Sequence, residues 1–461
     1  MSTFPARRTT QLFAASTLYG AATLAAALDT GCFGPADRRV LVVCNNAAVP
    51  ETAPALDAMP GFELLRGRFD DVISWNETIA PFHPSGWSPR PDDVPLWERH
   101  LRLAWELGDD DVELAVESIQ VNPAMAITGI FTGAPIDVYA DGLMSYGPTR
   151  SKLDPLTGTR IRRLLHLDLV PGLKPLLLTE FGVEPLVVET EGFLKVLGEL
   201  ASAPAELPSV EAPALLLGQY LSALGLITAA EEEELHLRMM RGAVALGHTR
   251  LVFKPHPTAP AQWSRSMEAE AERLGAELTV LDTGILRAPV LAEVIYERMR
   301  PALVVGCFST ALLTASAFYG LPVARVGTEL LLDRLTPYEN SNRVPVTLVD
   351  ALLPELDDRA AVAERRPSDG AEREVAALVE AVGFAMQPKI NPGLRPAAQR
   401  YLSTRLTPVT WRYFKRRRLT SLGLPGGVPA QFSFLPRNAA VRRAVRRARS
   451  LRRAVGRQKR P

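Results

Sequence analysis

Short apolar runs alternate with longer mixed segments over the first two hundred residues. Runs rich in Val, Ile and Leu are typical of buried strands, and longer segments with apolar residues at helical spacing predict helices. Strands separated by helices predict a parallel sheet with helices on both faces. The predicted strands are Gln11–Ala15, Arg39–Cys44, Phe69–Trp75, Val112–Glu117 and Ile136–Tyr139, the predicted helices are Pro95–Leu107, Ala124–Phe131 and Gly192–Ala203, and Pro171–Glu189 is predicted as extended pieces.

The first unit of this pattern allows a second interpretation. Gln11–Leu28 is rich in alanine and follows Arg7 and Arg8, as a signal peptide would. We favour a strand followed by a helix that Ser16-Thr17 cap and that ends near Gly31, because this gives a βαβ unit of ordinary length.

A proline-rich joint divides the chain. Residues 204–213 carry three prolines among small and acidic residues, and a second alternation begins after them. We expect an N-terminal domain over residues 1–205, a second domain over 214–385 and a tail over 386–461. The second alternation predicts strands at Ala214–Leu217, Arg250–Phe253, Glu277–Leu281, Ala302–Val305 and Val323–Val326, and helices at Ala229–Leu246, Pro260–Leu274 and Ser309–Phe318.

Composition adds the expected class and compartment. A chain of 461 residues with 47% hydrophobic and 22% charged residues fits a globular protein of two or three domains. Three cysteines show no metal-ligand spacing, which favours a reducing compartment and no metal site. No apolar run approaches the ~20 residues that a membrane span needs.

The charge distribution is strongly asymmetric. No Asp or Glu follows Glu380, whereas residues 381–461 hold 20 Lys and Arg. Within them, Arg437–Val455 has apolar residues at helical spacing among arginines, which predicts a basic amphipathic helix. An anionic membrane surface is the first partner that we expect, a polyanionic acceptor or nucleic acid ranks behind it, and a solvated tail is the simpler alternative.

The most distinctive motif follows a predicted strand. Lys254-Pro255-His256-Pro257 comes directly after an apolar run, and its two prolines cannot continue a β ladder. His256 therefore lies just beyond the carboxyl end of a strand, which is where ligands bind in open α/β sheets. By itself, a histidine is as often a structural group.

Two other predicted strands also end in polar residues. Asp141-Gly142 follows one of them, and Gly306-Cys-Phe-Ser309-Thr310 links another to an apolar helix. A helix N-terminus with hydroxyls suits a phosphate, although Ser and Thr are also ordinary caps and Asp-Gly is an ordinary turn. Further candidates for substrate contacts at predicted strand ends are Ser16, Thr17, Asn45, Gly218 and Gln219.

Together these groups fit transfer from a nucleotide donor. Such a reaction needs a base for the acceptor hydroxyl and hydrogen-bond donors around the leaving phosphate. Asp141 is the candidate base. His256, with Ser309 and Thr310, is a candidate to hold or protonate the phosphate, and Lys254, Pro257, Gly306 and Gly142 are expected to contact substrate.

At these residues the chain resembles the bacterial alpha-2,8-polysialyltransferase family over most of residues 10–330. The segments that carry the resemblance are TQLFAASTLYGAATLAAAL near the start, VESIQVNPA at 116–124, YADGLMSYGPTR at 139–150, KPHP at 254–257 and VGCFSTAL at 305–312.

The resemblance implies a GT-B fold, in which two Rossmann-like domains face a cleft. It also implies inverting transfer of sialic acid from CMP-sialic acid to a glycan or glycolipid, without a metal or other cofactor. The family's acidic-acidic-Gly motif corresponds to Ala140-Asp141-Gly142 and its His-Pro motif to His256-Pro257. Because the first acidic position is Ala140, Asp141 would serve as base alone.

Two alternatives remain at this point. Transferases that use CDP-glycerol to build wall polymers also combine a GT-B fold with His-Pro, and a non-catalytic protein could tether a polyanion through the tail. For the leading hypothesis we expect a cytoplasmic enzyme that is peripheral to the inner face of the membrane.

Overall fold

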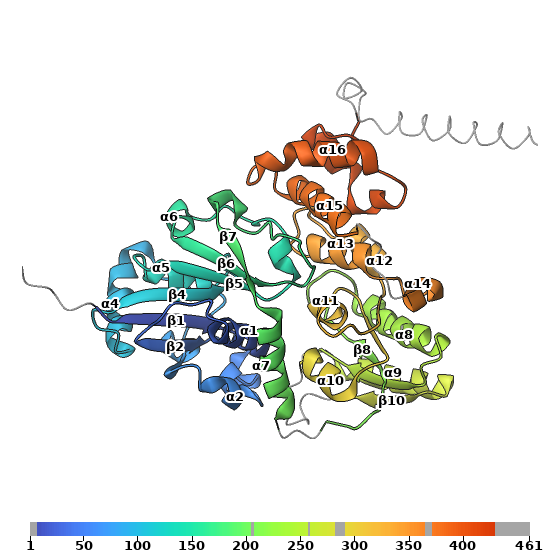
Figure 1. Cartoon of the computed structure of the whole chain (residues 1–461), viewed down its shortest axis with the longest axis horizontal. Helices are drawn as coiled ribbons and strands as arrows, with labels where there is room; N and C mark the ends of the chain where they lie inside the picture. The colour runs from blue at the N-terminus through green and yellow to red at the C-terminus, as the bar shows by residue number, and fades with distance from the viewer. Residues whose placement is uncertain (1–6, 204–206, 257–258, 282–290, 365–370, 429–461) are drawn as a thin grey trace, which may run out of the picture.

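Two parallel sheets organise the chain in a computed structural model, which describes residues 7–203, 207–256, 259–281, 291–364 and 371–428 (Figure 1). The first sheet has seven strands in the order β3-β2-β1-β4-β5-β6-β7. Every neighbouring pair in it is parallel. Its strands are β1 (Thr9–Ala15), β2 (Arg38–Val43), β3 (Asp71–Ser74), β4 (Asp111–Glu117), β5 (Ile136–Ala140), β6 (Ile161–Leu167) and β7 (Glu184–Val188).

Side chains along these strands alternate between two buried layers. Phe13, Leu41 and Val43 belong to one apolar cluster, and Leu12, Val40 and Val42 belong to the other. Helices cover both faces, as a parallel sheet requires. They are α1 (Leu18–Asp29), α2 (Phe62–Arg66), α3 (Trp75–Thr78), α4 (Val94–Ala104), α5 (Ala124–Ile130), α6 (Pro155–Gly158) and α7 (Thr190–Ser202), with short 3₁₀ turns η1 (Pro50–Thr52), η2 (Leu56–Ala58), η3 (Pro91–Asp93), η4 (Leu143–Tyr146) and η5 (Thr179–Phe181).

The second sheet has five parallel strands in the order β10-β9-β8-β11-β12. Its strands are β8 (Ala214–Leu217), β9 (Arg250–Lys254), β10 (Glu277–Val280), β11 (Leu303–Gly306) and β12 (Val323–Arg325). The helices of this part are α8 (Ala229–Ala245), α9 (Ala261–Leu274), α10 (Ala292–Met299), α11 (Thr310–Ala317), α12 (Thr328–Arg334), α13 (Arg343–Leu352) and α14 (Arg359–Glu364). We call residues 7–203 the N-terminal unit and the described residues from 207 onward the C-terminal unit.

The chain ends, as far as it is described, in packed helices. These are α15 (Ala371–Met386), η6 (Pro392–Leu394), α16 (Arg395–Arg405), η7 (Thr410–Tyr413) and α17 (Arg416–Leu422). Helix α15 contacts both α16 and α17, and its Gly383 lies against Leu176 and Pro148 of the N-terminal unit. A β-carbon on Gly383 would lie 2.6 Å from Leu176 Cδ1, so the absent side chain permits this close approach.

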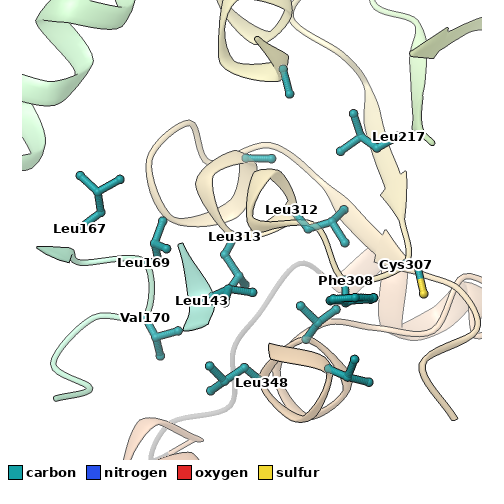
Figure 2. Close-up of a cluster of buried hydrophobic side chains, with 14 of the residues drawn as sticks. Leu143, Leu167, Leu169, Val170, Leu217, Cys307, Phe308, Leu312, Leu313 and Leu348 are labelled. Carbon is teal, nitrogen blue, oxygen red and sulfur yellow. The ribbon is translucent and has the colours of Figure 1, made fainter. Parts of the chain in front are cut away.

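An apolar core joins the two units. Figure 2 shows Leu143 of η4 beside Leu313 of α11, with Leu348 of α13 in the same cluster. Helix α10 also packs against α7, which lies between the two sheets in Figure 1. Because one continuous cluster contains buried residues of both units, the contact between them is a packed apolar core.

The expected α/β class, with two parallel sheets, is confirmed. The pattern missed β6, whose sequence IRRLLHL places two arginines side by side. Both arginines, Arg162 and Arg163, bind the buried Asp137 of β5, each with an N–O distance of 2.7 Å. The strand predicted at Phe69–Trp75 is shorter, because Ser74 caps α3 and Trp75 begins that helix.

The predicted tail is only partly within the described residues. Residues 395–422 form helices that bury Tyr401, Phe414 and Leu419. The predicted amphipathic helix Arg437–Val455 lies outside the described residues. We keep residues 204–213 as the proposed boundary between the first two domains. Among the described helices, none is long and apolar enough to cross a membrane.

Candidate active site

The strand order of each sheet creates one crevice. In the first sheet the order reverses between β1 and β4, and in the second it reverses between β8 and β11. Ligands bind at such switch points, beyond the carboxyl ends of the strands. Ser16 and Glu117 lie at the first switch point, and Gly218 and Ser309 lie at the second.

The predicted base and the predicted hydroxyl pair meet across the cleft. Asp141-Gly142 follows β5, and Ser309-Thr310 begins α11. A β-carbon built on Gly142 would lie 3.2 Å from Thr310 Oγ1. Ser309 is the N-cap residue of α11, and its hydroxyl accepts a hydrogen bond of 3.3 Å from the amide of Ala311. The positively polarised N-terminus of α11 therefore lies beside Gly142.

Two cavities share these four residues. The larger has a volume of about 460 Å³ and is walled mainly by the N-terminal unit, including Glu117, Gln120, Met144 and Arg150. The smaller has a volume of about 240 Å³ and is walled mainly by the C-terminal unit. The smaller cavity's other lining residues include Tyr19, Gly218, Lys254 and Glu293. Asp141 thus borders both cavities.

Burial changes the acidity of Asp141. Desolvation, together with the negative charges of Glu117 and Glu293, raises the pKa of Asp141 to about 7. Desolvation also raises the pKa of Glu117, against the opposing effect of its hydrogen bond from Ser16. A carboxyl with a pKa near neutrality is suited to take up a proton during turnover.

Polar groups in the smaller cavity have few partners. The hydroxyl of Tyr19 is buried and has no hydrogen-bond partner among the described residues. Desolvation lowers the pKa of the Lys254 amine and raises that of the Glu293 carboxyl, which accepts a hydrogen bond of 2.6 Å from Thr314. These three groups add one acceptor and two donors to the carboxyl of Asp141 and the hydroxyls of Ser309 and Thr310 in the same lining, as recognition of a polar ligand requires.

His256 lies apart from the described linings of both cavities. Its side chain is exposed beyond the end of β9, and its ring centre is 6.1 Å from that of Tyr220. Desolvation and the charge of Lys254 lower the pKa of His256. Pro257, the other half of the predicted pair, lies outside the described residues.

Most of the other residues predicted to contact substrate form hydrogen bonds or close contacts beside the two switch points. The amide of Gly218 donates to the carbonyl of Lys254 at 2.9 Å, and Gln219 Oε1 accepts from the amide of Phe308 at 2.9 Å. A β-carbon on Gly306 would touch Leu217, also of the second sheet, at 3.4 Å. Thr17 is the N-cap of α1, and its hydroxyl accepts from the amide of Gly20 at 2.9 Å.

Asn45 is not brought to either cavity that contains Asp141. Its side-chain amide donates to the carbonyls of Pro50 and Ala53, each at 3.0 Å, and so holds the loop after β2. It lines a separate hollow of about 490 Å³ that includes Phe82 and His83.

Comparison with known proteins supplies the family. Residues 11–328 match the family described as alpha-2,8-polysialyltransferase (POLYST). The chain belongs to the alpha-2,8-polysialyltransferase family. It is therefore a glycosyltransferase by family membership, as the sequence predicted. No curated protein sequence matches it.

Solved structures with similar architecture are distant. UGT2 of Phytolacca americana, complexed with UDP-2-fluoroglucose and pterostilbene, has 11% identity and a TM-score of 0.41, with 90% of this chain and 99% of that chain covered. A putative UDP-N-acetylglucosamine 2-epimerase from Listeria monocytogenes has 10% identity and a TM-score of 0.42, with 84% and 98% covered. The E. coli heptosyltransferase WaaC has 13% identity and a TM-score of 0.33, with 68% and 88% covered.

Sequence reasoning about this polysialyltransferase-family chain assigned no role to three residues near Asp141. They are Tyr19, Glu117 and Arg150. Glu117 carries the clearest signal, because it ends a predicted strand as Asp141 follows one. Glu293, in the first turn of α10, also lines the smaller cavity beside Asp141.

Proposed function

We propose that this polysialyltransferase-family enzyme transfers sialic acid from CMP-sialic acid to a hydroxyl of a glycan or glycolipid, with inversion and without a metal. The observation that carries the proposal is the meeting of Asp141-Gly142 with Ser309-Thr310, each pair following a strand at facing edges of the two sheets. This contact brings the proposed base and the proposed phosphate-binding helix N-terminus into one site.

Asp141 is the proposed general base. The acceptor hydroxyl loses its proton to the Asp141 carboxylate as its oxygen bonds to the anomeric carbon of the donor sugar. The bond from that carbon to the phosphate oxygen breaks on the opposite face, which inverts the centre. A carboxyl with a pKa of about 7 is half ionised near neutral pH and holds the transferred proton well.

The leaving phosphate is proposed to lie at the start of α11. The hydroxyls of Ser309 and Thr310, the helix dipole and the Lys254 amine all favour negative charge there. His256 lies beyond the same strand end as Lys254, and we assign it to the nucleotide side of the phosphate, where it could donate a proton. The side chain must approach the cleft for that role.

We assign the smaller cavity to the donor and the larger to the acceptor. The smaller cavity lies over β8 and β9 of the C-terminal unit and holds Lys254 and Glu293, which suit a phosphate and a sugar hydroxyl respectively. The larger cavity is bordered by Gln120, Arg150 and Ser341, with the apolar side chain of Met144 at its rim. Asp141 borders both, as a base that acts on the acceptor must.

Direct binding of CMP tests the donor site. We expect CMP to bind more tightly than UMP or CDP-glycerol, and binding to weaken in His256→Ala and in Ser309→Ala/Thr310→Ala. An equal affinity of the wild type and all variants would remove these residues from the site. Preference for CDP-glycerol would favour a glycerophosphotransferase instead. Turnover is then measured as CMP release from CMP-sialic acid with an acceptor panel.

Membrane docking is a separate proposal that rests on the tail. Residues 381–461 hold 20 basic residues and no acidic ones, and each basic residue near an anionic surface contributes about 1 kcal/mol. We expect the full chain to sediment with vesicles containing phosphatidylserine but not with neutral vesicles. Replacing Arg442, Arg443, Arg446 and Arg447 by Gln should release it. Sedimentation that is unaffected by these changes would contradict the proposal.

A further inference from the structure

Two carboxyl groups end neighbouring strands in the larger cavity. Glu117 is the last residue of β4, and it pairs in register with Tyr139 of β5. Asp141 follows Tyr139 by two residues, and both carboxylic residues line the same space. The family's motif places two acidic side chains in succession, whereas this chain has Ala140 at the first of those positions.

The carboxyl of Glu117 is held in a defined position. The hydroxyl of Ser16, just beyond β1, donates to Glu117 Oε2 at 2.8 Å. Tyr139 donates from its hydroxyl to the carbonyl of Ala14 at 2.9 Å, so the ends of β1, β4 and β5 are tied together. Ser118 has a φ of 48°, a left-handed conformation that non-glycine residues seldom adopt and that turns the chain sharply after Glu117.

Several elements contribute groups that face Asp141. Thr17, Tyr19 and Gly20 come from the start of α1, Tyr139 from β5 and Thr310 from α11. Two further carboxyls, Glu117 and Glu293, act on it through their charge. In the described lining of the smaller cavity, Lys254 is the only basic side chain. Glu117 and Asp141 line one cavity, and two carboxyls close together cannot both be ionised at little cost, so their protonation is linked.

We propose that Glu117 is the second carboxyl of this site, a positioning residue on β4 that replaces the acidic side chain missing at Ala140 and controls proton uptake by Asp141. The inference rests on the proposed role of Asp141 as base. The negative charge of ionised Glu117 increases the proton affinity of Asp141, which makes Asp141 a stronger base at neutral pH. Ser16 supports this by stabilising the ionised form of Glu117.

The pH profile of kcat/KM tests the role, with CMP release from CMP-sialic acid as the readout. Activity should rise with pH as Asp141 ionises, and this rise is the acid limb of the profile. In Glu117→Gln the negative neighbour is gone, so this acid limb should move to lower pH by about one pH unit. Ser16→Ala should move it in the same direction by less, because it disfavours the ionised Glu117. Adding Ala140→Glu to Glu117→Gln should move the limb back.

A matched control lies on the same strand. Glu113→Gln removes a β4 carboxyl that is bound by Gln11 and Arg162 at the far end, and it should leave the limb in place. An unmoved limb in an active Glu117→Gln enzyme would overturn the inference while leaving the proposed function intact. If Glu117→Gln does not fold, an unmoved limb in Ser16→Ala would do the same. Failure of Ala140→Glu to restore the limb would refute the replacement of Ala140.

A wild type without turnover or CMP binding would overturn the proposed function, and the inference with it. The two failures are therefore distinguishable. Failure of the proposed function is visible in the wild type alone, whereas failure of the inference is visible only in the variants.

Discussion

Replacing Asp141 by Asn separates the chemistry of this residue from its cost to stability. The substitution keeps the shape of the side chain and removes its ability to take up a proton. Loss of a general base reduces kcat by about 10²–10⁴-fold. Because Asp141 borders the donor cavity without a proposed contact to the nucleotide, the affinity for CMP should change little.

The same variant should be more stable than the wild type at alkaline pH. The pKa of Asp141 is raised from an ordinary value of 3.8 to about 7, so the folded chain holds this proton more tightly than the unfolded chain does. Stability is therefore lost as pH rises from about 4 to about 7, and the loss is complete above that. At about 1.4 kcal/mol per pKa unit this would be roughly 4 kcal/mol. Solvent reaches the half-buried carboxyl, so we expect about 2 kcal/mol.

Urea unfolding at about pH 8 and about pH 5, together with CMP release and CMP binding, measures all three effects. Asp168→Asn is the matched control, since Asp168 is also half-buried and follows the neighbouring strand β6. The control should retain turnover, because Asp168 lines neither cavity that contains Asp141. Turnover of Asp141→Asn within about tenfold of the wild type would refute the base role. A stability difference that does not grow with pH would refute the origin proposed for the raised pKa.

Three further predictions follow from the contact between the units. Gly142→Ala places a β-carbon 3.2 Å from Thr310 Oγ1 and should lower kcat/KM by tenfold or more, with an unchanged urea midpoint. Tyr19→Phe removes a buried hydroxyl that has no partner among the described residues, so it should raise the free energy of unfolding by up to about 1 kcal/mol and weaken donor binding in a titration. Leu313→Ala should lower the free energy of unfolding by about 2–5 kcal/mol in the same assay, because it leaves a cavity beside Leu143.

The sequence predicted those features that depend on local pattern. Strands β1, β2, β4, β5, β8, β9 and β11 were placed within a residue or two, because each is a short apolar run with a clear stop signal. Their carboxyl ends were therefore known, and so were the polar residues that follow them. Strand β6 was missed because Arg162 and Arg163 interrupt its apolar pattern, and their partner Asp137 is distant in sequence.

The meeting of particular strand ends depends on the order of strands, which periodicity does not contain. The sequence alone could not show that β4 lies between β1 and β5. Ser16 and Asp141 were therefore predicted as unconnected site residues, and Glu117 was not predicted as one. Nor could it show that Thr310 approaches Gly142, because that contact depends on the core around Leu143 and Leu313. The family's acidic-acidic-Gly motif does not supply this information either, because it contains only consecutive residues.

The strand order also explains why Ala140 need not weaken the site. In a parallel sheet, residues at the ends of adjacent strands are nearly as close as neighbours in sequence, since strands lie about 4.8 Å apart and consecutive Cα atoms about 3.8 Å apart. A carboxyl can therefore come from the end of β4 instead of the end of β5, and Glu117 is the one that we propose for this role. If the pH profile depends on Glu117 and can be restored from Ala140, the site requires a second carboxyl near Asp141 and not a particular position in the chain. The acidic-acidic-Gly motif would then be one of two ways to place a second negative charge beside the base.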